Sequence, residues 1–109
     1  MTDSEQSQQL TVGVVAESRP GERRVAVVPK LVGRLVQRGL RVVVEPGAGS
    51  GAHLSDDAYT QAGAELGDAW GAPIVVKVNP PNPAEVAKLS RGSVLIGFLD
   101  PRGNPDGLA

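Results

Sequence analysis

The sequence contains no cysteine and a single histidine, His53. Disulfides and thiolate metal sites are therefore excluded, and a metal site or a catalytic triad built on histidine lacks its parts. Aromatic residues are almost as scarce, since Tyr59, Trp70 and Phe98 are the only ones. The formal net charge is −1, and the lysines and arginines are scattered along the chain. A nucleic-acid binder needs a basic stripe and aromatic rings for base stacking, so no nucleic-acid partner is expected.

No apolar run approaches the roughly 20 residues that a helix needs to cross a bilayer. The first ten residues, MTDSEQSQQL, are polar and lack the basic region and apolar stretch of a signal peptide. These features predict a cytoplasmic protein without direct membrane insertion. With 109 residues the chain has room for one domain, which can bury roughly two-thirds of the surface of its unfolded form.

The hydrophobic pattern predicts an α/β domain over residues 10–109, preceded by a disordered N-terminus over residues 1–9. Valine-rich runs suit buried parallel strands, and Pro29, Gly39 and Ser55 are typical of helix ends. Strands are expected at residues 10–17, 41–46, 73–78 and 93–100, and helices at residues 29–39, 55–63 and 84–89. Strands that alternate with helices over short loops form an open parallel sheet with flanking helices. We therefore predict a flavodoxin- or Rossmann-like half-domain.

The end of the sequence predicts a truncated domain. Asn104 and Pro105 resemble the N-cap and the first residue of a helix, yet only four residues follow them. One face of the sheet would then lack its cover, which predicts association or poor solubility. The alternative interpretation is a disordered tail, because short termini are often poorly ordered.

Charged residues stand near the end of each expected strand: Glu17, Glu45, Lys77 and Asp100. In open parallel sheets, ligands bind outside the carboxyl ends of the strands, so these charges could share one functional edge. The simpler explanation is that a strand ends where polar residues begin. For Glu17 and Glu45 this simpler explanation is favoured.

Lys77 differs from the others because it lies inside an apolar run, between Val76 and Val78. A buried lysine needs a partner and can serve as a general base or as an anchor for a carboxylate. An edge strand with Lys77 facing solvent fits the pattern equally well. Arg24 could offer its planar fork to a substrate carboxylate, although an arginine in a polar loop is more often solvated. Asp100 precedes a proline, where an aspartate commonly shapes a turn.

A glycine-rich loop at residues 47–51 invites comparison with dinucleotide-binding loops. The dinucleotide fingerprint needs G-x-G-x-x-G between the first strand and its helix, whereas this loop follows the second strand with G-x-G-x-G spacing. We therefore expect the loop to supply turn geometry or close backbone packing. His53, beside it, is expected to be a surface or capping residue.

Several segments together resemble the N-terminal domain shared by alanine dehydrogenase and the alpha subunit of proton-translocating NAD(P) transhydrogenase. They are VGVVAESRPGERRVAVVPKLVGRLVQRG, VVVEPGAGSGAHLSDDAYTQAGAEL, IVVKVNPP and LIGFLDPRGNP. Their order and spacing match the family from about Thr11 to Pro105, which is nearly the whole chain. Small departures are Val15, where the family usually has proline, and Val28, where it prefers a small hydroxyl residue.

The resemblance implies roles for three residues. Arg24 corresponds to the arginine that grips the substrate carboxylate in the alanine dehydrogenase branch, and Lys77 to the lysine that acts at the substrate carbonyl. Asp100 stands where that branch has its catalytic histidine, a departure that favours the transhydrogenase branch. We therefore expect Lys77 to be catalytic and Arg24 and Asp100 to be substrate-binding, with no metal and no assigned cofactor-binding residue.

The resemblance also implies a complex. The chain would be the N-terminal part of a transhydrogenase alpha subunit, inactive alone, that supports hydride transfer between NAD(H) and NADP(H) coupled to proton translocation. NAD would be held mainly by sequence beyond this chain, and membrane and NADP-binding components would be partners of a homo-oligomer at the inner or plasma membrane. The alternatives are an alanine dehydrogenase-like fragment and a non-catalytic remnant or interaction module.

Overall fold

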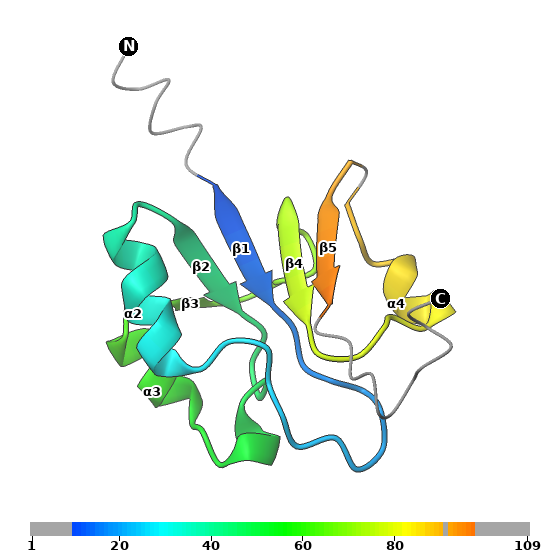
Figure 1. Ribbon diagram of the computed structural model, residues 1–109, viewed down its shortest axis with the longest axis horizontal. Helices are drawn as coiled ribbons and strands as arrows, with labels where there is room; N and C mark the ends of the chain where they lie inside the picture. The colour runs from blue at the N-terminus through cyan, green and yellow to red at the C-terminus, as the bar shows by residue number, and fades with distance from the viewer. Residues whose placement is uncertain (1–9, 91, 98–109) are drawn as a thin grey trace.

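The computed structural model describes residues 10–90 and 92–97. The predictions for residues 1–9, for Phe98 and Asp100, and for the end of the chain therefore lie outside the described residues. The elements are β1 (Thr11–Val14), α2 (Pro29–Gln37), β2 (Arg41–Val44), the 3-10 helix η1 (Ser50–Ala52), α3 (Asp56–Gln61), β3 (Glu65–Leu66), β4 (Ile74–Lys77), α4 (Pro83–Val86) and β5 (Val94–Gly97). The strands form one parallel sheet in the order β3-β2-β1-β4-β5 (Figure 1). The predicted α/β fold with an open parallel sheet is confirmed.

The residues that were predicted to begin and end helices do so in the structure. Pro29 opens α2, where its missing N–H costs no hydrogen bond. The Ser55 side chain accepts a hydrogen bond from the N–H of Ala58 and so caps α3. Gly39 and Gly63 follow the two helices with φ of 90° and 111°, which a glycine adopts without strain. Local sequence signals thus mark where both helices begin and end, while packing of Val32 and Tyr59 in the core stabilises them.

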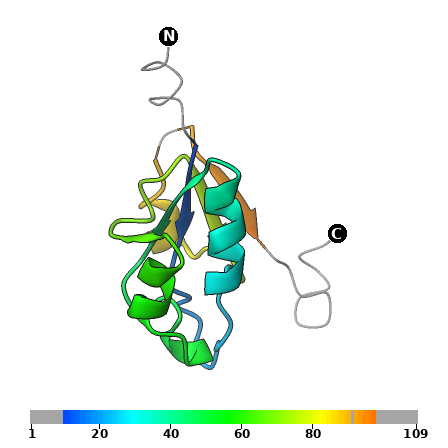
Figure 2. The same cartoon turned by 90° about the vertical axis from the view of Figure 1, so that its left-hand side faces the viewer.

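The two faces of the sheet are covered differently. Figure 2 shows α2 on one side of the sheet and α4 on the other. The core on the α2 side also includes Tyr59 of α3, and its strand residues are Val12, Val14, Val42, Val44 and Val76. The core on the opposite side consists of Val15, Val43, Ala69, Trp70 and Val75, with Leu89 and Leu95 packed against it. Burial of these side chains, most of them aliphatic, is the main stabilising contribution in the chain.

The connection between β3 and β4 is where the sequence-based prediction is incomplete. The two-residue strand β3 was not predicted, and no helix joins it to β4. The chain instead crosses the sheet as a loop from β3, next to β2, to β4 on the far side of β1. Ala69 of this loop lies so close to β1 that a Cβ atom built on Gly13 would stand 2.0 Å from its carbonyl oxygen. The absence of a side chain at Gly13 therefore allows the loop to lie directly on the sheet.

The edge strand β5 presents apolar side chains to solvent. Val94 and Ile96 are 55% and 44% exposed, and their pairing with Ile74 and Val76 places them on the α2 side of the sheet. Within the described ranges, no helix meets the length and hydrophobicity that a membrane span requires.

Candidate functional site

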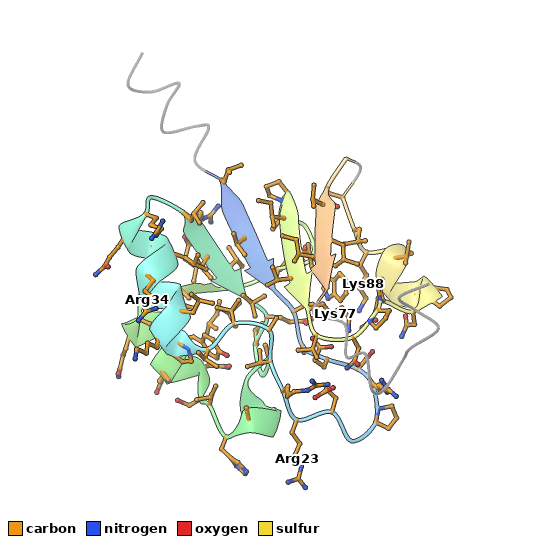
Figure 3. The ribbon with its side chains drawn as sticks, in the orientation of Figure 1. Arg23, Arg34, Lys77 and Lys88 are labelled. Carbon is orange, nitrogen blue, oxygen red and sulfur yellow. The ribbon has the colours of Figure 1, made fainter. Side chains whose placement is uncertain are left out.

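The candidate site lies at the carboxyl ends of β1 and β4. The chain builds the sheet outward from β1, first to β2 and β3 and then to β4 and β5, so the strand order reverses between β1 and β4. Open α/β sheets bind ligands at such a switch point. Seven polar side chains meet there, which we call the rim cluster: Glu17, Arg19, Glu22, Arg24, Lys77, Asn79 and Glu85. Figure 3 shows Lys77 at the end of β4.

Lys77 is buried in the interior of the sheet. Its strand pairs with β1 on one side and β5 on the other, so the edge-strand interpretation of Lys77 is wrong. The side chain is 1% exposed, and its Nζ lies 2.8 Å from Glu17 Oε1 and 3.7 Å from Glu85 Oε1. A charge buried this deeply requires a partner, because its lost hydration must be replaced. Two carboxylates supply that partner here.

Glu17 is the acceptor that organises this side of the cluster. Its side chain is 2% exposed and accepts hydrogen bonds from Lys77 Nζ, from the N–H groups of Val78 and Asn79, and from Asn79 Nδ2. The interpretation of Glu17 as an ordinary polar strand end is therefore wrong. Glu45 does have a structural role, since it accepts a hydrogen bond from the N–H of Ala16 at 2.7 Å.

Glu85 enters the cluster from α4. Its carboxylate accepts hydrogen bonds from the Ser18 hydroxyl at 2.8 Å and from the N–H of Asn82 at 3.0 Å. The Asn82 side chain in turn accepts from the N–H of Glu85, which completes a capping box and explains why α4 begins there. Burial raises the pKa of Glu85, but the hydrogen bonds from Asn82 and Ser18 and the charge of Lys77 outweigh it and lower the pKa. Glu85 is therefore a carboxylate at neutral pH.

Arg24 lies on the loop side of the cluster and is paired with Glu22. Its Nε and NH2 groups donate to the two carboxylate oxygens of Glu22, each at 2.8 Å. The Arg24 side chain is 55% exposed, whereas that of Glu22 is 8% exposed. Hydrogen bonds from the Arg24 side chain hold the pKa of Glu22 well below its usual range, despite the opposing effect of burial. This bidentate geometry is the strongest form of arginine–carboxylate pairing.

The predicted site residues do not open into one pocket. Lys77 lines a hollow of about 310 Å³ together with Arg19 and Glu85. Arg24 lines a separate hollow of about 140 Å³ together with Glu17 and the glycine loop. Asp100 lies outside the described residues, so its place relative to either hollow stays a prediction. In the part of the chain that the structure describes, no group of acidic, histidine or cysteine side chains could hold a metal ion.

The glycine loop packs against the loop that carries Arg24. A Cβ atom on Gly51 would lie 3.1 Å from the Cα of Arg23, and one on Gly49 would lie 2.7 Å from the ring of Tyr59. Gly47 has φ of 82°, which suits the turn after β2. The prediction that this loop serves turn geometry and close packing is confirmed. His53 is exposed and follows η1 as its C-cap, with φ of 62°, so the prediction of a surface or capping role for His53 is also confirmed.

Tyr59 holds the loop that follows Arg24 through a hydrogen bond, and removal of its hydroxyl should destabilise that loop. Its hydroxyl donates to the carbonyl oxygen of Val27 at 2.7 Å, and the residue is fully buried. Tyr59→Phe leaves this carbonyl without its donor and should lower the free energy of unfolding by about 1–2 kcal/mol, measured by urea denaturation.

The same bond gives the Tyr59 prediction a pH signature. Burial, and then the charge of Asp56, raise the pKa of Tyr59 from 10.0 to about 12. The neutral phenol therefore stabilises the fold fully below pH 10, and this contribution disappears as the pH rises through about 12. The stability difference between the wild type and Tyr59→Phe should shrink over that alkaline range. A difference that does not vary with pH would contradict this account.

Glu22 should give the opposite pH dependence. Because its pKa is lowered in the fold, ionised Glu22 stabilises the fold above its ordinary pKa of 4.5, and the contribution is lost as the pH falls through the lowered value. Glu22→Gln should cost about 1 kcal/mol at neutral pH, after discounting for the exposure of Arg24, and progressively less in acid. Urea denaturation at several pH values measures this difference.

A matched control for Glu22 is the pair between Arg41 and Glu65. It has the same bidentate geometry, with both contacts at 2.7 Å, but both side chains are half exposed. Glu65→Gln should therefore have a smaller effect than Glu22→Gln. Equal effects would show that burial of the Glu22 carboxylate adds nothing to the strength of its pair.

Comparisons with known proteins place this geometry in context. The family model described as "Alanine dehydrogenase/PNT, N-terminal domain" matches residues 13–109. The NAD(P) transhydrogenase subunit alpha of Haemophilus influenzae is 36% identical over 100 residues, which is 89% of this chain and 20% of that protein. The alanine dehydrogenase of Bacillus subtilis is 38% identical over 101 residues, which is 89% of this chain and 27% of that protein.

Solved structures give the same two branches. The transhydrogenase from Sinorhizobium meliloti matches with a TM-score of 0.78 at 39% identity, covering 90% of this chain and 30% of that chain. An L-alanine dehydrogenase matches with a TM-score of 0.79 at 36% identity, covering 89% and 28%. The chain thus spans less than a third of each of these relatives, and overall similarity does not separate the two branches.

Proposed function

Because this chain belongs to the family of alanine dehydrogenase and transhydrogenase N-terminal domains, we propose that it forms the N-terminal part of an NAD(P) transhydrogenase alpha subunit. In that role it supports hydride transfer between NAD(H) and NADP(H), coupled to proton translocation through other components, and is inactive alone. One observation carries this choice over an amino-acid dehydrogenase. Lys77 and Arg24 are already paired with Glu17 and Glu22, each at 2.8 Å, which opposes capture of a small carboxylate substrate.

The proposed roles within the site follow from position. Lys77 lies at the switch point of the sheet and acts as the catalytic residue on the substrate side. Arg24, which lines the smaller hollow, contributes to binding. Asp100 is proposed as the third residue on the strength of the family resemblance alone.

The described residues do not fit the cofactor. A dinucleotide-binding loop leaves room for a pyrophosphate beside its glycines, but the backbone at Gly51 is packed against Arg23, and Gly49 against Tyr59. This packing supports the proposal that NAD is held mainly by polypeptide beyond this chain. What this chain supplies is a rigid, charge-balanced surface at the carboxyl ends of the strands.

The proposed complex includes membrane and NADP-binding components, with the chain on the cytoplasmic side and peripheral to the membrane. It also includes further copies of the chain. Two features support partners of this kind: the similar protein of Haemophilus influenzae is itself named as one subunit of a transhydrogenase, and β5 exposes Val94 and Ile96.

Exposure on β5 gives a testable expectation for self-association. Ile96→Lys should lower the average molecular mass measured by sedimentation equilibrium, because a lysine on the apolar face opposes its burial between copies. Lys30→Ile, at an exposed position of α2, is a control that adds apolar surface elsewhere. A wild-type chain that is monomeric at all concentrations would contradict association through this face.

The alternative is an alanine dehydrogenase-like function. It is favoured by the 55% exposure of the Arg24 side chain beside a hollow, which leaves the guanidinium within reach of a ligand. The remaining alternative is a non-catalytic remnant or interaction module, in which the rim cluster serves stability alone.

Two assays in cells that produce the chain separate these functions. Deletion of the chain should abolish reduction of NAD by NADPH in membrane vesicles and leave NAD-dependent oxidation of alanine unchanged. The wild-type chain should restore the reduction of NAD by NADPH, whereas Lys77→Met and Arg24→Gln should restore it poorly. Two control substitutions at exposed positions, Lys88→Met and Arg23→Gln, should restore it fully. Loss of alanine oxidation instead would support the dehydrogenase, and no loss of either activity would support the non-catalytic module.

A further inference from the structure

Asn79 occupies the centre of the rim cluster. It follows β4 by two residues, is 6% exposed, and donates its backbone N–H to Glu17 Oε1 at 3.1 Å. Its side chain makes three further contacts. The Nδ2 group donates to Glu22 Oε1 at 2.9 Å and to Glu17 Oε1 at 3.4 Å, and Oδ1 accepts from Arg19 at 3.1 Å. A carboxamide in this orientation points its donors at two carboxylates and its acceptor at a guanidinium, so every polar atom is matched.

The contacts of Asn79 fall on oxygens that already serve the two ion pairs. Glu22 Oε1 accepts from both Arg24 NH2 and Asn79 Nδ2. Glu17 Oε1 accepts from both Lys77 Nζ and Asn79 Nδ2. One amide group therefore shares an acceptor with each cation. The Asn79 side chain thus bonds to both carboxylates.

We infer that Asn79 is a positioning residue that joins the Arg24–Glu22 pair to the Lys77–Glu17 pair, so that a change at Arg24 is transmitted to Lys77. If Arg24 leaves Glu22, the released oxygen becomes a stronger acceptor for Asn79 Nδ2. The amide then turns toward Glu22 and away from Glu17, across its longest contact of 3.4 Å. Glu17 Oε1 loses a competing donor and binds Lys77 more strongly, because donors that share one acceptor oxygen compete for its lone pairs.

This route matters because the two cations do not share a pocket. Arg24 and Lys77 line different hollows, and a ligand at the Arg24 hollow would not need to touch Lys77. Coupling through Asn79 would let occupancy of one hollow set the position of the buried lysine in the other. Its consequence for hydride transfer rests on the proposed function, whereas the coupling itself is a property of these side chains.

The test is a double-mutant cycle read at Lys77 by NMR, on the 109-residue chain. Arg24→Gln removes the cation from Glu22, and the readouts are the ¹⁵N shift and the hydrogen-exchange rate of the Lys77 ammonium group. In the wild-type background the substitution should shift the signal and slow its exchange. In the Asn79→Leu background the same substitution should produce an effect smaller by about threefold or more.

The structure explains why Asn79→Leu is a selective change. The backbone N–H groups of Val78 and Asn79 still donate to Glu17, so the Lys77–Glu17 pair persists without the bridging amide. Asn79→Ala is a second variant in case the larger side chain disturbs the fold, and backbone amide spectra verify each fold. Arg23 is a neighbouring exposed arginine whose side chain points away from Lys77 (Figure 3). The control substitution Arg23→Gln should therefore leave the NMR signal of Lys77 unchanged.

Each outcome is decisive for the inference. An equal effect of Arg24→Gln in both backgrounds would show that the charge of Arg24 acts on Lys77 directly through space. No effect in the wild-type background would show that the two ion pairs are independent. Either result overturns the inference. A further readout needs no change at position 79, since the side-chain amide protons of Asn79 should move with Arg24→Gln. The experiment measures no catalysis, so it can succeed even if the proposed transhydrogenase function fails.

Discussion

Replacement of Gly13 by alanine should prevent the chain from folding stably. A Cβ atom at this position would lie 2.0 Å from the carbonyl oxygen and 2.8 Å from the carbonyl carbon of Ala69, and 3.0 Å from the Cβ of Ala72. The clash is with backbone, so no change of rotamer relieves it. Gly13 also pairs with Val43 and Val75 in neighbouring strands, so β1 cannot move without breaking the sheet.

The expected loss for Gly13→Ala exceeds the roughly 1–3 kcal/mol that overpacking of a core usually costs. That is a large share of the 5–15 kcal/mol by which domains are typically stable, so we expect a much lower midpoint of urea denaturation, followed by circular dichroism. Gly33→Ala is the matched control. Gly33 lies inside α2, where a Cβ would meet only the carbonyl oxygen of Ala62 at 3.9 Å.

The control should change stability in the opposite direction. Alanine favours a helix over glycine by about 1 kcal/mol, and 3.9 Å is an ordinary contact, so Gly33→Ala should raise the midpoint of urea denaturation. A folded Gly13→Ala protein with near wild-type stability would show that the loop between β3 and β4 can leave the sheet at little cost.

The contrast between these glycines shows what local sequence patterns can predict. Gly39 follows a helix and was correctly predicted to end it, because that role depends on neighbours in the sequence. The role of Gly13 depends on Ala69, which lies 56 positions further along the chain. No periodicity marks that contact. For the same reason the crossing loop after the very short strand β3 was missed.

The candidate site shows the same division. The position of Lys77 within an apolar run correctly raised the possibility of a buried lysine in search of a partner. No partner role was predicted for Glu17, because an acidic residue at the end of a strand is common. What decides the pairing is the parallel register, in which Val14 lies beside Val76 and so brings the ends of β1 and β4 together. An acid just past the first strand, combined with a buried lysine at the end of a neighbouring strand, is the signal that could have identified the pair.

Glu17→Gln should destabilise the chain strongly at neutral pH. Its carboxylate lies 2.8 Å from Lys77 Nζ, and both side chains are at most 2% exposed. The neutral amide withdraws the charge that balances the ammonium. It also keeps a single acceptor oxygen, so its NH₂ donor must face either Lys77 Nζ or the N–H of Val78. Breaking a buried pair from one side costs about 3–5 kcal/mol, because the remaining charge stays in the interior. Glu85, at 3.7 Å from Lys77, compensates only in part.

Removal of the second charge should recover much of that loss. Glu17→Gln combined with Lys77→Met leaves no uncompensated ammonium, since methionine fills a similar volume without charge. The double variant should therefore be more stable than Glu17→Gln alone, as measured by the midpoint and slope of urea denaturation. Lys77→Met alone should also cost less than Glu17→Gln, because Glu17 keeps its backbone donors at Val78 and Asn79.

The order of these variants separates two accounts of the buried pair. If the pair chiefly supplies stability, both single variants and the double variant should lose similar amounts. If the fold instead tolerates the pair in order to keep a lysine at the switch point, the double variant should approach the wild type in stability while failing to restore transhydrogenation. We expect the second result, because removing both charges of a buried ion pair together also removes the cost of desolvating each of them. A Glu17→Gln chain as stable as the wild type would show that Lys77 does not depend on Glu17 for its charge balance.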